Sequence, residues 1–148
     1  MGTDAATAGL TEAAEKEEEM DVPEAVEDAV EDLMTGLEDK DTIVRWSAAK
    51  YISRLSSLLP LSFSDQIAEA VISLYDRDAV SVGEAGGTDE YDLSAVKEST
   101  WHGASLAVAE MARRGVLNPE RLAQLVPWLL RVRRLPACAR KMVQSDLL

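Results

Sequence analysis

Cysteine and histidine are almost absent from this sequence, which has one residue of each among its 148. Cys138 has no partner for an internal disulfide, which is typical of a protein kept in a reducing cytosol. His102 has no second histidine or paired cysteine with which to hold a metal ion or form a catalytic dyad. The sequence therefore predicts a cytoplasmic protein with no metal or cofactor, in which His102 has a packing or surface role and Cys138 is not reactive.

Several segments that would indicate other functions are also missing. No apolar run approaches the roughly 20 residues that span a bilayer, and the N-terminus lacks the basic and apolar regions of a signal peptide. The glycine-rich stretch 83–87 is not followed by Gly-Lys-Ser/Thr, so we interpret it as a flexible loop and not as a phosphate loop. A nucleophile elbow, Gly-x-Ser-x-Gly, is not formed around Ser47, Ser53, Ser56 or Ser57. We predict no catalytic site and no enzyme activity.

Basic residues are scarce at the start of the chain, where residues 1–41 carry 15 acidic and 2 basic side chains. Residues 42–148 carry 12 acidic and 13 basic ones, so the formal net charge of −12 comes from the acidic leader. Such a leader disfavours binding to nucleic acid or to an anionic membrane. Residues 1–20 have only Leu10 and Met20 as large apolar side chains, and we expect them to be disordered.

An internal repeat organises the rest of the chain. Three segments carry apolar residues with the spacing i, i+3, i+4, i+7, i+8, which forms one stripe along an α-helix. Shifts of 41 and 55 residues superimpose them, and the first spacing is typical of HEAT and armadillo repeats. The three sets are Val26, Ala29, Val30, Leu33 and Met34; Ile67, Ala70, Val71, Leu74 and Tyr75; and Leu122, Leu125, Val126, Leu129 and Leu130.

The shift of 55 also matches the helices that precede the last two stripes. It places Trp46, Ala48 and Ala49 on Trp101, Gly103 and Ala104. An aromatic residue followed by two small ones indicates a helix face that fills a gap and then lets a neighbouring helix approach closely. We therefore predict that both tryptophans pack in the core or between repeats, with aromatic anchoring of a partner as the alternative.

The pattern predicts an all-α, HEAT/armadillo-like solenoid of about five helices. We expect helices near residues 22–38, 42–58, 63–77, 98–114 and 118–133, with an inserted polar loop at about 78–97. Predicted N-caps are Asp41, Asn118, Ser62 or Ser64, and Ser99 or Thr100, and Gly115 ends the fourth helix. Pro127 predicts a kink in the fifth helix, or a helix that starts near Val126.

The segment Asp39-Lys40-Asp41-Thr42-Ile43-Val44-Arg45-Trp46-Ser47-Ala48-Ala49-Lys50 resembles the HEAT signature, in which Val-Arg follows three and four residues after an aspartate. Its residue sequence is similar to that of the tubulin-folding cofactor D (tubulin-specific chaperone D) family. So are Val22-Pro23-Glu24-Ala25-Val26-Glu27 and the segment from Trp101 to Glu110, with Arg113-Arg114-Gly115 after it. The resemblance covers about residues 21–132, the central part of a longer all-helical protein, and residues 134–148 do not continue it.

The resemblance implies a fragment of a protein-binding scaffold. Members of that family bind β-tubulin after the cytosolic chaperonin releases it, and they assemble the αβ heterodimer with cofactors E and C. The complex stimulates GTP hydrolysis by tubulin, and the family also binds an ARF-like small GTPase. A cytoplasmic, microtubule-associated location goes with these roles. The resemblance assigns no partner-binding residue.

Two groups of charged residues have alternative interpretations. Asp41 and Arg45 could hold a partner's phosphate or carboxylate, but in HEAT repeats these positions more often cap a helix and link repeats. A cluster of arginines near the C-terminus is interpreted as a solvated face, with an acidic protein surface as the alternative; RNA binding lacks the interleaved aromatic residues that it needs. The cluster comprises Arg113, Arg114, Arg121, Arg131, Arg133 and Arg134.

Two alternatives to the tubulin role stay open at this point. The chain could be a general HEAT adaptor for a different protein partner. It could also be a truncated product without independent function, because fewer than three complete repeats make a marginal solenoid.

Overall fold

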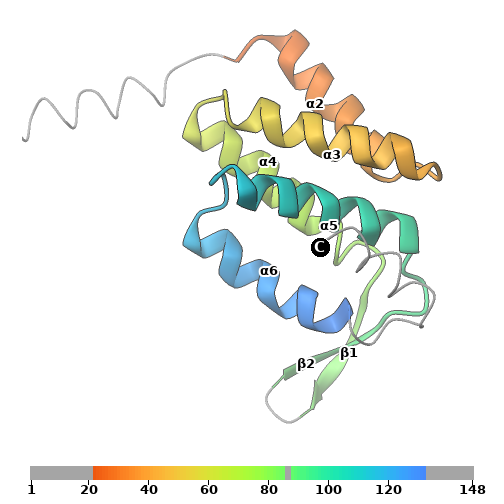
Figure 1. Cartoon of the computed structure of the whole chain (residues 1–148). Coiled ribbons are helices and arrows are strands. Elements are labelled where there is room, and N and C mark those ends of the chain that lie inside the picture. The colour runs from red at the N-terminus through yellow and green to blue at the C-terminus, as the bar shows by residue number, and fades with distance from the viewer. Residues whose placement is uncertain (1–21, 86–87, 133–148) are drawn as a thin grey trace, which may run out of the picture.

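A computed structural model describes residues 22–85 and 88–132 of the chain. Within that part, five helices and one β-hairpin follow each other (Figure 1). They are α2 (Glu24–Leu37), α3 (Thr42–Ser56), α4 (Leu61–Ser73), β1 (Val80–Ala85), β2 (Thr88–Asp92), α5 (Glu98–Arg113) and α6 (Pro119–Val132). The all-α repeat architecture predicted from the sequence is confirmed, and each predicted helix is present within a few residues of its expected ends. The predicted disordered leader (1–20) and non-family tail (134–148) lie outside the described residues and stay predictions.

The helices stack as repeats in two layers. In Figure 1, α3 and α5 run side by side, and their contact is the most extensive one between any two helices of the described residues. The other layer contains α2, α4 and α6, which precede or follow those two helices in the chain. The helix pairs are α3 with α4 and α5 with α6. Each pair thus joins one helix from each layer, as the shift of 55 residues predicted.

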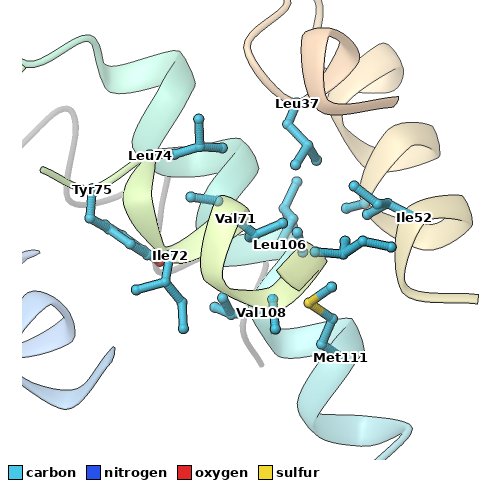
Figure 2. Close-up of a cluster of buried hydrophobic side chains, with 14 of the residues drawn as sticks. Leu37, Ile52, Val71, Ile72, Leu74, Tyr75, Leu106, Val108 and Met111 are labelled. Atoms are coloured by element: carbon cyan, nitrogen blue, oxygen red, sulfur yellow. The ribbon is translucent and has the colours of Figure 1, made fainter. Parts of the chain in front are cut away.

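The core lies between the layers (Figure 2). Leu37 at the end of α2 and Ile52 of α3 point toward Val71 of α4, toward Leu74 at its C-cap, and toward Leu106 of α5 (Figure 2). All of these side chains are buried, so the stripe of α4 is covered from both neighbouring pairs. Close packing of this kind makes the stack sensitive to the loss or gain of single methyl groups.

Helix ends follow the sequence signals in part. Asp41 Oδ1 accepts a hydrogen bond from Ile43 N at 2.8 Å and Asn118 Oδ1 accepts one from Arg121 N at 2.8 Å, so both predicted N-caps are confirmed. Gly115 has φ of 70° directly after α5, as a C-terminal glycine does. The serine and threonine caps are wrong, because α4 and α5 begin after Pro60 and Lys97, without a side-chain cap. A restart near Val126 is also wrong, since α6 contains Pro127 inside one helix.

The insertion between α4 and α5 differs from the polar loop that the sequence predicted, because it contains an antiparallel hairpin. Val80 pairs with Asp92 and Ser81 with Tyr91, and Val82 forms a bulge before Gly83, whose φ is 139°. Val80, Val82 and Tyr91 favour extended backbone, but an isolated two-stranded hairpin is marginal in water. Tertiary contacts therefore hold this hairpin. Because local sequence does not record such contacts, the glycine-rich composition indicated a loop.

Candidate protein-interaction surfaces

Arg45 occupies the arginine position of the HEAT signature and is fully buried. Its Nη1 donates to the backbone carbonyls of Asp39 and Lys40 at 2.6 and 3.0 Å, and its Nη2 donates to Thr42 Oγ1 at 2.9 Å. Its Nε donates to Nδ1 of His102 on α5 at 2.9 Å. One guanidinium therefore ties the α2–α3 turn to the next repeat, which confirms the structural interpretation of Asp41 and Arg45.

His102 is fully buried in the α3–α5 contact. Its Nδ1 accepts the hydrogen bond from Arg45, so this nitrogen carries no proton. The sequence predicted a packing or surface role; the structure assigns packing. The repeat did not indicate the Arg45–His102 pair, because the shift of 55 places Arg45 on Thr100 and not on His102.

A second arginine network joins α4 to α6. Arg121 donates from Nε and Nη2 to the carboxylate of Asp65, at 2.9 and 2.7 Å, and from Nη2 to Glu69 Oε2 at 3.0 Å. Asn118 Nδ2 also donates to Asp65 Oδ1, at 2.7 Å. The hydrogen bond from Arg121 is the largest cause that lowers the pKa of Asp65 below its usual 3.8. The network stabilises the second helix pair against the first.

Replacing Asp65 with asparagine should lower the melting temperature at pH 6 and have much less effect at pH 3. Because the folded-state pKa of Asp65 is depressed, its stabilisation is present above about pH 4 and is lost as the pH falls further. Thermal melts followed by circular dichroism across this range give the difference between the two chains. Asp28→Asn, at an exposed carboxylate of α2, is the control, and a pH-independent difference for Asp65→Asn would contradict the expectation.

An aromatic cluster fixes the hairpin to the helices. Trp101 is buried, packs edge-on against Tyr75 at 5.5 Å between ring centroids, and lies 6.2 Å from Trp128 of α6. Tyr91 of β2 lies 5.0 Å from Trp128, and the guanidinium of Arg131 lies 4.6 Å from the ring of Tyr91. Arg131 Nη2 also donates to the carbonyl of Asp89 at 3.2 Å. The predicted packing role of Trp101 is confirmed.

Trp46 does not share the environment of Trp101, although the repeat matches them. Its relative exposure is 38%, so it does not pack in the core of the described residues, and its packing against a further repeat stays a prediction. The shift that superimposes Trp46 and Trp101 places Ser73 at the position of Trp128. A serine is too small to cover an indole ring as Trp128 does, and the first repeat leaves its tryptophan partly open.

The arginines near the C-terminus do not form one surface. Arg121 is buried in its network, Arg131 stacks on Tyr91 and Trp128, and Arg113 pairs with Glu110 at 2.6 Å. Arg133 and Arg134 lie outside the described residues. The predicted solvated face therefore applies to Arg113 and Arg114 of the described residues, and the rest of the described cluster has structural contacts.

The serines considered as nucleophiles have local partners. Ser53 and Ser56 are buried and donate to the carbonyls of Ala49 and Ile52 at 2.9 and 2.8 Å, and Ser57 donates to the carbonyl of Arg54 at 2.7 Å. Between residues 22 and 132, apart from 86 and 87, no group of three His, Cys, Asp or Glu side chains could hold a metal ion. None of the helices described is long and apolar enough to cross a bilayer.

The apolar stripes of α4 and α6 match in sequence but differ in burial. In α4, Ile67, Val71 and Leu74 are buried. Their counterparts in α6 are largely exposed, and Val126 has 50% exposure where Val71 has 0%. α4 is covered by the helix pair that follows it, whereas the described residues contain no pair after α6. The outer face of α6, defined as Leu122, Val126, Leu129 and Leu130, is thus a candidate protein-interaction surface.

Truncation of the two matched valines should separate these environments. Val71→Ala should lower the free energy of unfolding by about 2 kcal/mol, since a buried cavity remains. Val126→Ala should change it by less than about 0.5 kcal/mol. Urea unfolding followed by circular dichroism measures both. Equal losses for the two variants would mean that the outer face of α6 is covered in the isolated chain.

The opposite end of the stack has a second apolar surface. A groove of about 270 Å³ between α2 and α3 is lined by Leu33, Tyr51, Arg54, Leu55 and Leu58. Ile43 and Val44 at the start of α3 are also exposed. The repeat places Leu33 and Tyr51 on Leu74 and Leu106, which are buried between helix pairs. Each end of the stack therefore exposes a face whose matched copy is an inter-repeat contact.

Comparison with known proteins agrees with this architecture. Residues 2–134 match a family model described as tubulin-specific chaperone D-like, ARM repeats. Tubulin-specific chaperone D of Dictyostelium discoideum is 41% identical over 96 residues, which are 64% of this chain and 6% of that protein. Tubulin-folding cofactor D of Schizosaccharomyces pombe is 30% identical over 98 residues, or 66% of this chain and 9% of that protein. No solved structure matches.

Proposed function

Because the chain belongs to the tubulin-specific chaperone D-like family of ARM-repeat proteins, we propose that it is a non-catalytic scaffold segment that acts in the folding of β-tubulin after its release from the chaperonin and in assembly of the αβ heterodimer. The match over residues 2–134 carries the proposal. In this role the segment works with the other tubulin cofactors and an ARF-like small GTPase, in the cytoplasm and near microtubules. Stimulation of GTP hydrolysis belongs to the complete complex.

The chain spans less than a tenth of the length of the two relatives, so the role is that of one segment in a longer solenoid. We place the outer face of α6 and the α2–α3 groove against further helix pairs of the same kind. The repeat supports this placement, because the residues that match these two surfaces elsewhere in the chain are buried between its own helix pairs. Stacking of this type lets each pair bury an apolar face that it cannot cover alone. The surfaces left for tubulin are then the lateral ones.

A segment exchange in the relative from Schizosaccharomyces pombe tests the role. Its 98 matched residues are deleted in one variant and replaced by the corresponding part of this chain in another. Binding to purified β-tubulin is measured by surface plasmon resonance. We expect the deletion to abolish binding and the exchange to restore it to within about tenfold of the parent, or about 1.4 kcal/mol.

A folded exchange variant that fails to bind β-tubulin would contradict the proposal. Folding is checked by the helical circular dichroism signal and by a cooperative melt. Retention of an importin or a phosphatase subunit, with no tubulin, would favour the general adaptor instead. A non-cooperative melt of the isolated chain at low temperature would favour a truncated product without independent function.

A further inference from the structure

The hairpin β1–β2 projects from the stack of helices beyond the end of α6 (Figure 1). It interrupts the repeat between α4 and α5, and the stack itself does not need it, because α3 follows α2, the helix that matches α4, without such an insertion. Its base is nevertheless held firmly through Tyr91, Trp128 and Arg131. An element that is both dispensable for stacking and anchored in one orientation suits the presentation of a surface.

The two strands have different surroundings. Tyr91 of β2 contacts Trp128, and the carbonyl of Asp89 accepts a hydrogen bond from Arg131, so α6 covers β2. Among the residues that the structure describes, the sheet has two strands, so β1 pairs along one edge, with β2. In such a ladder about half of the N–H and C=O groups of each strand point away from its partner. The outer edge of β1 is therefore a template for a further strand.

Apolar side chains accompany this open edge. Val80 and Val82 have exposures of 58% and 59%, although valine in a short strand is usually covered. Val80 lies opposite Asp92, while the next pair, Ser81 and Tyr91, belongs to the face that meets Trp128. Since successive side chains alternate between the faces of a strand, Val80 lies on the face turned away from α6. Val82, at the bulge, is exposed to the same extent as Val80.

The charge of the hairpin favours one kind of partner strand at the edge of β1. Residues 80–92 contain four acidic and no basic side chains. Asp89, Glu90 and Asp92 are exposed, and hydrogen bonds from Ser94, the backbone N–H first, lower the pKa of Asp92, so this carboxylate is ionised at neutral pH. An incoming strand with acidic residues would be repelled, whereas lysine or arginine side chains would be attracted.

We propose that the outer edge of β1, over Val80–Gly83, binds an extended segment of a partner protein in which apolar and basic residues alternate. The segment adds a third strand to the hairpin: main-chain hydrogen bonds supply affinity, Val80 and Val82 receive its apolar side chains, and the negative charge of the hairpin attracts its basic ones. This goes beyond the scaffold role and does not require that the partner be β-tubulin.

The test uses the full chain, labelled with ¹⁵N, and an acetylated, amidated eight-residue peptide of alternating valine and lysine as the probe. Amide shifts should change most at residues 80–83 during titration. A peptide of alternating valine and glutamate should bind at least about tenfold more weakly at 50 mM salt, and the lysine peptide should weaken as the salt is raised.

Three variants locate the site. Asp89→Lys with Glu90→Lys should lower the affinity for the lysine peptide at least about tenfold, and Val82→Pro should abolish binding because proline removes a backbone N–H of β1 and disrupts the strand. Val82→Ser leaves the backbone intact and should weaken binding several-fold. Retained shifts of Tyr91 and Trp128 show in each case that the hairpin is still docked. Absence of binding to the parent chain at 1 mM peptide, equal binding of the two peptides, or largest shifts on the helices would each overturn the proposal.

Discussion

Gly103→Ala should destabilise the chain by about 3 kcal/mol or more, enough to remove a large part of the stability of a small domain. A Cβ atom at Gly103 would lie 1.8 Å from the carbonyl oxygen of Leu37 and 2.7 Å from its carbonyl carbon. Both of these atoms are backbone, so no side-chain rotation relieves the overlap. The end of α2 would have to move away from α5, and that would open the contacts of Leu37 in the core.

Urea unfolding of Gly103→Ala and two glycine controls measures this effect. A Cβ at Gly36 would lie 3.0 Å from the Cβ of Ala48, a tight contact that a small shift of α2 against α3 can relieve. Gly115 has open space around it but a φ of 70°, so alanine there should cost about 1 kcal/mol through backbone strain alone. We expect the losses to rank Gly103 first by a wide margin. A loss at Gly103 no larger than that at Gly115 would show that α2 and α5 are not in close contact.

Arg45→Met should lower the free energy of unfolding by about 3 kcal/mol. Methionine keeps most of the side-chain volume, but the carbonyls of Asp39 and Lys40 and Nδ1 of His102 lose their donor. An acceptor left without a partner costs about 1–3 kcal/mol where it is buried, as Nδ1 of His102 is, and less at the part-buried carbonyls of Asp39 and Lys40. The relief from no longer burying a guanidinium opposes this loss, and we expect the three orphaned acceptors to outweigh it.

A double-mutant cycle isolates the contact between repeats. His102→Leu removes one orphaned acceptor, so Arg45→Met should cost about 1 kcal/mol less in that background than in the parent chain. Arg54→Met, at an exposed position of the same helix, is the matched control and should change stability by less than about 0.5 kcal/mol. Additive effects of the two substitutions would show that Arg45 stabilises only its own turn.

The sequence was sufficient for the repeat and for the positions that permit close packing. Gly103 was recognised because the shift of 55 residues placed two small residues after each tryptophan, and the structure puts Gly103 against Leu37. Asp41 and Arg45 were interpreted as structural from their signature, and their hydrogen bonds confirm it. These features were accessible because helix periodicity and capping are local, and because a repeated pattern records the same packing twice.

Several features of the candidate surfaces could not be predicted in this way. The sequence treats Val71 and Val126, or Trp101 and Trp46, as equivalent, yet one member of each pair is buried and the other is not. Their burial depends on which helix or side chain follows in the stack, and this is a property of neighbours and not of the pattern itself.

A stack of helix pairs was determined by the sequence alone, since a stripe repeated at one spacing specifies which helix faces must meet. The tertiary structure alone decided which helix faces are covered by neighbours within the described residues and which are exposed there. It also decided that the glycine-rich insertion forms a hairpin. Two short strands gain too little from their own hydrogen bonds to be stable, and the contacts of Tyr91 and Asp89 with Trp128 and Arg131 supply further stabilisation.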